Sequence, residues 1–581
     1  MCNELSDGIM KAKCLEKLYI PDNKMVKGLS SIIYNLAFQP SIKVLDASYN
    51  KTCDLKEAAV SLNKLIKMSQ TIETIIINNI PGLNMQLTND FYNALGDNNN
   101  LLYLDLHKNG SFNDIYQLGH AIAFNALKNG SLEYLDISSC LGDYTNFMNF
   151  IKSMQISEND HMSWYGFQFN GNIAKDSPQY FEKVFHCKLK TLNIKDCRLQ
   201  SYINYLAPLE EQKENGMKIL LNNNNLDTLI FDNSQVNSNF IKSISESIKS
   251  PNNLQYLSLS NCDMKGEIFQ YFLPCFYEAK DKNINLEKKM KIKKSKNRFV
   301  MDGDKVTVNP NFHIKGLDLS CNNFGYSSIF SLCQALKMNK TLEYLNLFHN
   351  CIDVSGAGQV GEVLKVNNNL IELDIGYNRI KNNGFKKVIN GIKENQTSKL
   401  KKLGVKYNFI KDKVLEEQFD VIENTDTISL EEIELKNNSL TSRFLSSFYQ
   451  DKYNKMKKNI KTDVFYILYS LEPERLERTV WLDKGVNDTE NEIYQTILGL
   501  EKNSDCIGIP LAIKKLRGRK TGAKKDSCEN NAFVEFIMPN SVNRMLKIGK
   551  SNQFYLSGKK RNIYKAGTRL DYLVVKQKKM K

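Results

Sequence analysis

A short pattern of apolar and polar positions recurs along most of the chain. The nine residues LLYLDLHKN at 101–109 return as LEYLDISSC at 132–140 and as LEYLNLFHN at 342–350. Leucine or isoleucine stands at positions one, four and six of each copy, and Asn or Cys stands at position nine. This alternation predicts a short strand whose apolar side chains point into a core while the residues between them point outward.

The pattern continues on both sides of these copies. Further copies begin at Leu254, Ile314, Leu370 and Leu430, and weaker ones begin at Leu15, Ile42, Ile72, Met162, Leu189, Leu226 and Leu400. The roughly 15 residues after each predicted strand carry apolar positions three and four apart, which predicts a helix. Because one copy cannot bury its own leucines, the copies must stack to form a continuous core.

The nine-residue pattern resembles the leucine-rich-repeat core L-x-x-L-x-L-x-x-N/C, and its period with a helical second half resembles the ribonuclease-inhibitor-like class. The resemblance covers residues 15–438 and implies an α/β horseshoe-shaped solenoid of about 14–15 repeats. It implies a large curved binding surface rather than one particular function. We expect this leucine-rich-repeat domain and its caps to occupy residues 1–475, with a last helix and a terminal strand at 463–471.

Residues 280–312 interrupt the period, because the copies at Leu254 and Ile314 begin 60 residues apart. The sequence KMKIK at 289–293 can form the strand of a degenerate repeat. Alternatively, the segment is a basic insertion that ends in a hairpin at Asp302 and Gly303. The preserved period favours the degenerate repeat.

Two rows of side chains are predicted on the concave face. Position three supplies the aromatic residues Tyr103, Tyr134, Trp164, Tyr256 and Tyr344, and position five supplies the acidic residues Asp46, Asp105, Asp136, Asp318, Asp374 and Glu434. Rows of rings and carboxylates indicate a protein-binding surface that prefers basic or amphipathic segments. Alternatively, Tyr and Asp stand at these positions in this repeat class whatever the partner is.

Several chemistries lack support in the sequence. The glycines of Gly356, Gly358 and Gly361 match G-x-G-x-x-G, but the predicted strand ends nine positions before Gly356, so we expect no dinucleotide site. The six histidines are scattered and none has zinc-site spacing, so neither a metal nor a cofactor is expected. No nucleophile and base, phosphate loop or metal spacing stands in context, so we expect no enzyme activity.

Cysteine usage and apolar runs bear on the compartment. The chain has 13 cysteines, without a CxxC pair, which fits free thiols in a reducing environment. Cys140, Cys197 and Cys262 fill position nine of their repeats, where we expect them to replace Asn in packing. The sequence MCNELSDGIMKAK lacks the apolar stretch of a signal peptide, and no apolar run reaches about 18 residues. We expect an intracellular protein, with nucleus and cytoplasm both open.

The net charge of the chain is concentrated at its C-terminal end. Residues 511–581 carry 19 Lys and Arg against 4 Asp and Glu, whereas the preceding 510 residues carry 60 of each sign. A body without net charge that carries one basic segment indicates a polyanionic partner for that segment.

The basic segment has its own pattern after Pro473, where the leucine period stops. Strand-like stretches at 478–485, 506–516, 531–538 and 569–577 alternate with helical spacing at 488–502 and 541–549. The order β-α-β-β-α-β is that of a ferredoxin-like α+β domain, which we expect at residues 476–581.

Two strands of this segment resemble an RNA recognition motif. The residues V-W-L at 480–482 resemble its RNP2 strand, and N-A-F-V-E-F at 531–536 resembles the second half of RNP1. The resemblance implies that Trp481 and Phe533 stack on unpaired bases. A basic loop is expected to contact the RNA backbone through Lys514, Lys515, Arg517, Arg519, Lys520, Lys524 and Lys525.

The match departs from the motif at one end. Glu529, Asn530 and Asn531 stand where RNP1 has a basic residue, a glycine and an aromatic residue, so one ring and one phosphate contact are missing. A ferredoxin-like domain that contacts protein is the alternative, and nuclear localisation is a second use for the basic run.

These observations favour an adaptor that is not an enzyme. It would hold single-stranded or looped RNA in its C-terminal domain and a protein partner on its repeat arc, without inserting in a membrane. The alternative is a structural scaffold of a cytoskeletal, ciliary or other large protein assembly, with the basic domain bound to an acidic protein surface.

Overall fold

The computed structural model describes residues 2–279, apart from gaps at 13, 26, 129, 157–183, 186, 200–215, 222–224 and 265, and then residues 306–440. Beyond residue 440 it describes 452–456, 460–463, 479–482, 510–516, 531–536 and shorter pieces. The chain divides into unit 1, Met1–Gly404 with Glu417–Leu430, and unit 2, Val405–Glu416 with Glu431–Lys581. This division falls inside the repeats, and the boundary at residue 475 stays a prediction.

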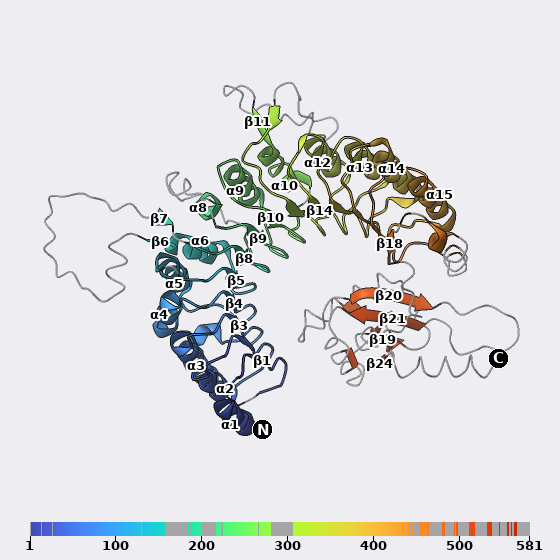
Figure 1. The fold of residues 1–581 in the computed structure, drawn as a ribbon. Helices are drawn as coiled ribbons and strands as arrows, with labels where there is room; N and C mark the ends of the chain where they lie inside the picture. Colours follow the sequence, from blue (N-terminus) through green and yellow to red (C-terminus); the bar gives the residue numbers. More distant parts are fainter. Residues whose placement is uncertain are drawn as a thin grey trace, which may run out of the picture. The chain divides into compact units, whose positions relative to one another are not determined.

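Short parallel strands form one face of unit 1 (Figure 1). In order across the sheet they are β1 (Lys17–Tyr19), β2 (Val44–Asp46), β3 (Thr74–Ile76), β4 (Tyr103–Asp105), β5 (Tyr134–Asp136), β8 (Thr191–Asn193), β9 (Thr228–Ile230), β10 (Tyr256–Ser258), β13 (Gly316–Asp318), β14 (Tyr344–Asn346), β15 (Glu372–Asp374) and β16 (Lys402–Gly404). Each strand covers positions three to five of a repeat, the first part of the alternating run that was predicted to be extended. Position four pairs with position four across the sheet, so Leu104 lies beside Leu135, and both are fully buried.

Helices cover the opposite face of unit 1 (Figure 1). They are α1 (Cys2–Lys11), α2 (Leu29–Leu36), α3 (Leu55–Met68), α4 (Asn89–Asp97), α5 (Ile115–Leu127), α6 (Tyr144–Ser153), α8 (Gly216–Leu221), α9 (Ser238–Ile248), α10 (Gly266–Phe269), α12 (Tyr326–Met338), α13 (Val354–Leu364) and α14 (Lys381–Glu394), with 3-10 turns η1 (Asn84–Gln86) and η3 (Leu273–Phe276). Polar residues fix several helix starts. Asp114 and Asp353 each accept hydrogen bonds from two backbone N–H groups of the first turn of α5 and α13. Helix α15 (Asp412–Glu423) spans the division between the units.

The residue at position nine, which is Asn or Cys in the repeats quoted above, joins consecutive repeats through hydrogen bonds. The Asn109 side chain accepts a hydrogen bond from the Ile80 N–H at 2.8 Å and donates one to the Ile77 carbonyl at 2.6 Å. Where Cys140 replaces Asn, its thiol lies 3.4 Å from the Leu106 carbonyl. Burial raises the pKa of this thiol to about 12, which disfavours the reactive thiolate, and the residue packs in the place of Asn.

The sheet corrects the prediction of a repeat at Met162. Strand β5 pairs directly with β8, with Tyr134 beside Thr191, so the sheet has no place for a strand between them. The intervening chain leaves and returns through an antiparallel pair, β6 (Gln155–Ile156) with β7 (Val184–Phe185). The row position assigned to Trp164 is therefore occupied by Thr191, and Trp164 itself lies outside the described residues.

The same argument applies to residues 280–312. Strand β10 pairs on one side with β9 and on the other with β13, so a degenerate repeat has no place in the sheet. An antiparallel pair, β11 (Tyr277–Ala279) with β12 (Val306–Val308), again stands at the two ends of the extra chain. The insertion was therefore the correct alternative, and the preference for a degenerate repeat was wrong. The predicted hairpin at Asp302 lies outside the described residues.

Unit 2 contains the end of the repeats. Strand β17 (Glu432–Glu434) pairs in parallel with β18 (Lys461–Thr462), which begins two residues before the predicted terminal strand. Residues 464–471 of that prediction lie outside the described residues. A short 3-10 turn, η4 (Tyr453–Lys455), precedes β18. Asp463, the residue after β18, accepts hydrogen bonds from the N–H groups of Leu435 at 2.6 Å and Lys436 at 3.0 Å. This carboxylate satisfies backbone groups that a further repeat would otherwise bond.

A separate four-stranded antiparallel sheet follows in unit 2. Its order is β20 (Pro510–Leu516), β21 (Asn531–Phe536), β19 (Thr479–Leu482) and β24 (Ile563–Lys565). Strand β24 lies before the predicted strand at 569–577, which is outside the described residues. A hairpin of β22 (Tyr555–Leu556) and β23 (Lys559–Lys560) precedes it. Fully buried side chains of this part include Val480, Leu482, Ile493, Ile497, Val534 and Met545.

Candidate binding surface on the strand face

The strand face of unit 1 consists of the outward positions three, five and seven of its repeats. Tyr103 and Tyr134 occupy position three of neighbouring strands, and their rings stack with centroids 3.9 Å apart and planes 7° apart. Burial is the main cause that raises the pKa of the Tyr103 hydroxyl, followed by its hydrogen bond with Tyr134. The two phenols therefore form one rigid, partly exposed aromatic plate.

The remaining predicted rings do not extend this plate. Thr191 and Thr228 occupy position three in the next two strands. Tyr256 lies beside Gly316, and a Cβ on that glycine would meet the tyrosine ring at 2.5 Å. Tyr344 is 42% exposed. The aromatic row is thus one stacked pair with two separate tyrosines, not a continuous stripe.

The acidic row faces the predicted side but is less exposed than a solvent-facing row. Asp105 and Asp136 are 6% and 7% exposed. Asp105 accepts hydrogen bonds from the His107 N–H at 3.1 Å and from Asn78 Nδ2 at 2.7 Å. Asp136 accepts from the Ser138 N–H at 2.9 Å and from Asn193 Nδ2 at 2.7 Å. Both carboxylates hold the chain turn after their strand; Asp105 also bridges to the preceding repeat and Asp136 to the following one.

The later members of the row repeat this arrangement. Asp318 accepts from the Ser320 N–H at 2.8 Å and from Asn346 Nδ2 at 2.9 Å. Asp374 accepts from the Gly376 N–H at 2.7 Å. Burial raises the pKa of Asp318, as it does that of Asp136, where the charge of Asp105 adds to the effect. These four carboxylates therefore have a structural role within the repeats, and whether they also bind a partner stays a prediction.

One cluster on this face has no counterpart in the sequence predictions. His107 Nδ1 lies 2.7 Å from Asp105 Oδ1 and 4.0 Å from Asp136 Oδ2, beside the Tyr103–Tyr134 plate. The signal was present at positions five and seven of one repeat and position five of the next. It was missed because metal-site spacing was sought within one segment, whereas parallel register brings residues 29 and 31 apart together.

Positive charge balances part of the face further along the sheet. Lys195 Nζ lies 3.1 Å from Asp232 Oδ2, both at position seven. Within unit 2, Lys406 Nζ lies 2.7 Å from Glu434 Oε2. The face is therefore not uniformly acidic, and its negative charge is greatest where carboxylates lack such a lysine.

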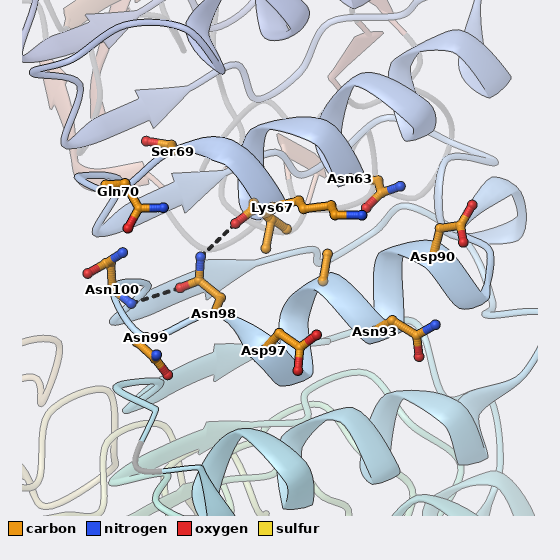
Figure 2. A pocket seen from close by; sticks show the side chains of 12 residues that line it. Asn63, Lys67, Ser69, Gln70, Asp90, Asn93, Asp97, Asn98, Asn99 and Asn100 are labelled. Carbon is orange, nitrogen blue, oxygen red and sulfur yellow. Dashed lines mark hydrogen bonds between the residues drawn. The ribbon is translucent and has the colours of Figure 1, made fainter. Parts of the chain in front are cut away.

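A pocket on the helix side of unit 1 lies between α3 and α4 (Figure 2). It is lined by polar side chains, among them Asn63, Lys67, Asp90 and Asp97. Asn98 in its wall donates to the Ile66 carbonyl at 2.7 Å and accepts from the Asn100 and Leu101 N–H groups. This asparagine connects the repeats, so the pocket is a polar groove between them and not a formed ligand site.

The glycine motif has a packing role. Gly356, Gly358 and Gly361 lie within α13, so the loop that a dinucleotide fingerprint requires is absent there. A Cβ on Gly361 would lie 2.5 Å from the Lys387 carbonyl oxygen. The glycine permits close contact of α13 with α14.

The predicted RNA-binding residues fall into two groups. Trp481 and Phe533 are directly paired across β19 and β21, and Lys514 of β20 is paired with Phe533. Tyr564 of β24, which the sequence analysis did not select, is paired with Trp481. Lys515 lies next to Lys514 on β20, opposite Ala532. The other basic residues, Arg517, Arg519, Lys520, Lys524 and Lys525, lie outside the described residues.

Within the part of the chain that the structure describes, the helices are all too short or too polar to cross a membrane.

Comparison with known proteins identifies the repeats. A family model of the leucine-rich repeat matches residues 311–333, 339–358 and 366–388, and a second matches residues 253–275. The chain therefore contains leucine-rich repeats. No curated protein sequence matches it.

Several solved structures are similar to the chain at low identity. An internalin from Listeria monocytogenes is 13% identical, with 79% of this chain and 88% of that chain covered and a TM-score of 0.31. The structure of the Rad7 and Elc1 complex in yeast is 12% identical, with 79% of this chain and 87% of that chain covered and a TM-score of 0.37. The TLR13–ssRNA13 complex is 15% identical, with 69% of this chain and 40% of that chain covered and a TM-score of 0.30.

Proposed function

We propose that this protein is a non-enzymatic adaptor that binds a protein partner on the strand face of its leucine-rich repeats and single-stranded or looped RNA on its C-terminal sheet. The Tyr103–Tyr134 plate beside Asp105, Asp136 and His107 supports the first activity most directly. Rigid, partly exposed tyrosines with a polar tip are the side chains that contribute most to protein interfaces.

The composition of the face points to a partner segment with basic and apolar residues. A cationic side chain placed over the tyrosine plate would meet aromatic faces and the field of two nearby carboxylates. The side chains at position three form the exposed part of this surface. The buried carboxylates Asp105 and Asp136 add negative charge, and their hydrogen bonds hold them in place. Leucine-rich repeats in general present such surfaces to proteins.

The C-terminal sheet supports the RNA-binding part of the proposal. The chain order β19, β20, β21, β24 and the helical residues near Ile493 and Met545 fit the ferredoxin-like order. Strands β21 and β19, which carry the RNP1-like and RNP2-like sequences, are the central pair of that sheet.

Side-chain alternation favours the stacking role. Val480, Leu482 and Val534 are fully buried, so strand alternation leads us to expect their neighbours Trp481 and Phe533 on the other face of the sheet. Trp481, Phe533 and Tyr564 lie in one row across three strands, and Lys514 continues that row on β20. Tyr564 supplies an aromatic residue that the incomplete RNP1 sequence lacks. Three aromatic residues in one row suit successive unpaired bases.

The three cysteines at position nine of their repeats are poor candidates for a catalytic nucleophile, which fits the proposal that the protein is not an enzyme. Burial raises the pKa of Cys140, Cys197 and Cys262 to about 12 in each case. At neutral pH these groups are protonated, so they lack the thiolate that nucleophilic catalysis requires.

RNA binding is tested on the full chain with a fluorescent single-stranded RNA library at several salt concentrations. We expect Trp481→Ala or Phe533→Ala to weaken binding by about 1–3 kcal/mol with little change in salt dependence. Combined alanine changes at Arg517, Arg519 and Lys520 should instead lower the log–log salt slope by roughly 0.7 for each lost phosphate contact.

A thermal melt of each variant separates binding from folding. A destabilised Trp481→Ala variant with normal affinity in its folded fraction would remove the stacking claim. If the unmodified full chain retains no RNA, the scaffold with a protein-docking basic domain is the better assignment.

Protein binding is tested with peptides selected from a random library on the full chain. We expect Tyr134→Ala to weaken the selected peptides by about 10–30-fold, because a central aromatic anchor is lost. Tyr116→Ala is the matched control, since Tyr116 lies on α5 on the helix face and is 39% exposed. Equal loss in both variants would place the binding surface elsewhere.

A further inference from the structure

We propose that Asp105, His107 and Asp136 bind a divalent first-row transition-metal ion on the strand face. The ligand atoms of the three side chains lie within 4.8 Å of one another. Two come from one repeat and one from the next, held by the direct pairing of β4 with β5. The inference does not depend on what protein or RNA the chain binds.

The distances suit a metal after small side-chain movements. Ligands that each lie about 2.0–2.2 Å from a tetrahedral zinc-like ion are roughly 3.3–3.6 Å from one another. The His107 Nδ1 distances of 2.7 Å to Asp105 Oδ1 and 4.0 Å to Asp136 Oδ2 lie on either side of that interval. An imidazole that carries its proton on Nε2 would present the Nδ1 lone pair between the two carboxylates.

The charge of the cluster favours a cation. Asp105 and Asp136 lie side by side at 6% and 7% exposure, and among the described residues their one basic partner is His107. Elsewhere on this face Asp232 has Lys195 within 3.1 Å. Two adjacent buried carboxylates without a lysine or arginine are costly unless a positive charge reaches them.

Asn78 provides an independent indication of a ligand. This residue is 4% exposed and donates Nδ2 to Asp105 Oδ2 at 2.7 Å, while its buried Oδ1 has no hydrogen-bond partner. Asn193, which donates in the same way to Asp136, has its Oδ1 bonded to the Ser138 hydroxyl at 3.1 Å. Half a turn of the Asn78 carboxamide would bring its unpartnered oxygen to the carboxylate, where a cation would draw it.

The donor set defines the class of ion. One imidazole and two carboxylates suit Mn²⁺, Fe²⁺, Co²⁺ or Zn²⁺ rather than a thiolate-seeking ion. Three protein ligands leave coordination positions for water, since the His107 side chain is 22% exposed and opens to the face.

The test uses Mn²⁺ with the full chain, because this ion binds thiols weakly and the protein has many free cysteines. The paramagnetic resonance signal of free Mn²⁺ gives the number of ions bound, and Zn²⁺ is then added as a competitor. We expect His107→Gln and Asp136→Asn each to weaken one Mn²⁺ equivalent by at least about tenfold, and Asn78→Ala to weaken it less.

Two control variants remove the same chemical groups elsewhere. Asp318→Asn deletes a position-five carboxylate whose partners are Ser320 and Asn346, and His349→Gln deletes another histidine. Both should bind Mn²⁺ as the unchanged protein does. Thermal melts identify any variant that fails to fold, and His107→Gln, with its partly exposed side chain, keeps the test decisive if Asp136→Asn unfolds.

Two results would overturn the proposal. One is equal Mn²⁺ binding by the unchanged protein and by folded His107→Gln. The other is the lack of any Mn²⁺ or Zn²⁺ bound by the folded, unchanged protein at roughly 1 mM, the weak end of biological divalent sites.

Discussion

Replacing Asp105 with alanine should destabilise the repeats, although the residue faces outward from its strand. The carboxylate is 6% exposed and accepts hydrogen bonds from Asn78 Nδ2, the His107 N–H and His107 Nδ1. A simple rule of outward positions would treat Asp105 as solvent-facing and predict no effect. The structure predicts that two buried donors lose their acceptor.

The expected magnitude follows from these three contacts. A hydrogen bond to a charged acceptor contributes about 1.5–3 kcal/mol, and a buried donor without an acceptor costs about 1–3 kcal/mol. Two effects offset part of this loss, because the partly exposed His107 ring can bond water and the repulsion between Asp105 and Asp136 disappears. We expect a net loss of about 2 kcal/mol in the free energy of unfolding.

The assay is urea unfolding of the full chain by circular dichroism, with hydrogen exchange of peptides from β3, β4 and β5. Exchange is needed because repeat arrays open locally and a single global free energy can hide the effect. Asp426→Ala is the control, since this aspartate of unit 1 is exposed. If Asp105→Ala matches Asp426→Ala in both measurements, the structural role assigned to position five is refuted.

Three further outcomes test the packing and the electrostatics. Leu104→Asp should cost more than about 4 kcal/mol in the same urea assay, because a charge enters a fully buried position; a smaller loss would place Leu104 outside the core. Gly391→Ala should lower the free energy of unfolding by about 1–3 kcal/mol, since its Cβ would lie 2.2 Å from the Gly361 carbonyl oxygen. Gly358→Ala should instead raise it by about 0.5–1 kcal/mol, because the nearest atom to its Cβ belongs to the flexible Lys387 side chain, at 3.2 Å. Burial raises the pKa of Asp318, so the folded state binds this proton more tightly than the unfolded state, and the contribution of Asp318 to stability falls as pH rises. The stability of Asp318→Asn relative to the unchanged protein should therefore increase between about pH 4 and pH 7. A difference that does not change with pH would contradict the shift.

The strands were predictable because the leucine pattern marks each of them locally. Positions one, four and six specify which residues enter the core. The strand Tyr103–Asp105 begins two residues after Leu101, the first residue of its repeat, and the other strands begin at the same position of theirs. The insertions were not predictable in this way. An interval of 60 residues fits two periods equally well, and only the pairing of β10 with β13 excludes an extra strand.

The candidate site depended on contacts that no local pattern contains. Sequence placed Tyr103 and Asp105 on the correct face, but the exposure of Asp105 depends on Asn78, which belongs to the preceding repeat. Likewise Asp136 is bonded to Asn193, 57 residues later in the chain, because β8 follows β5 directly in the sheet. An extra repeat at Met162 would have separated these two residues.

The uneven charge of the strand face connects its structural and binding roles. Carboxylates at position five accept hydrogen bonds from the turns that follow their strands, so they have a structural role whatever they bind. What differs along the face is their compensation: Asp232 has Lys195, while the adjacent Asp105 and Asp136 have the titratable His107. A cationic ligand therefore gains most beside the Tyr103–Tyr134 plate, whether the cation is a metal ion or a basic side chain of a partner. Because one positive charge satisfies the same two carboxylates, a bound metal should weaken recognition of a basic segment there.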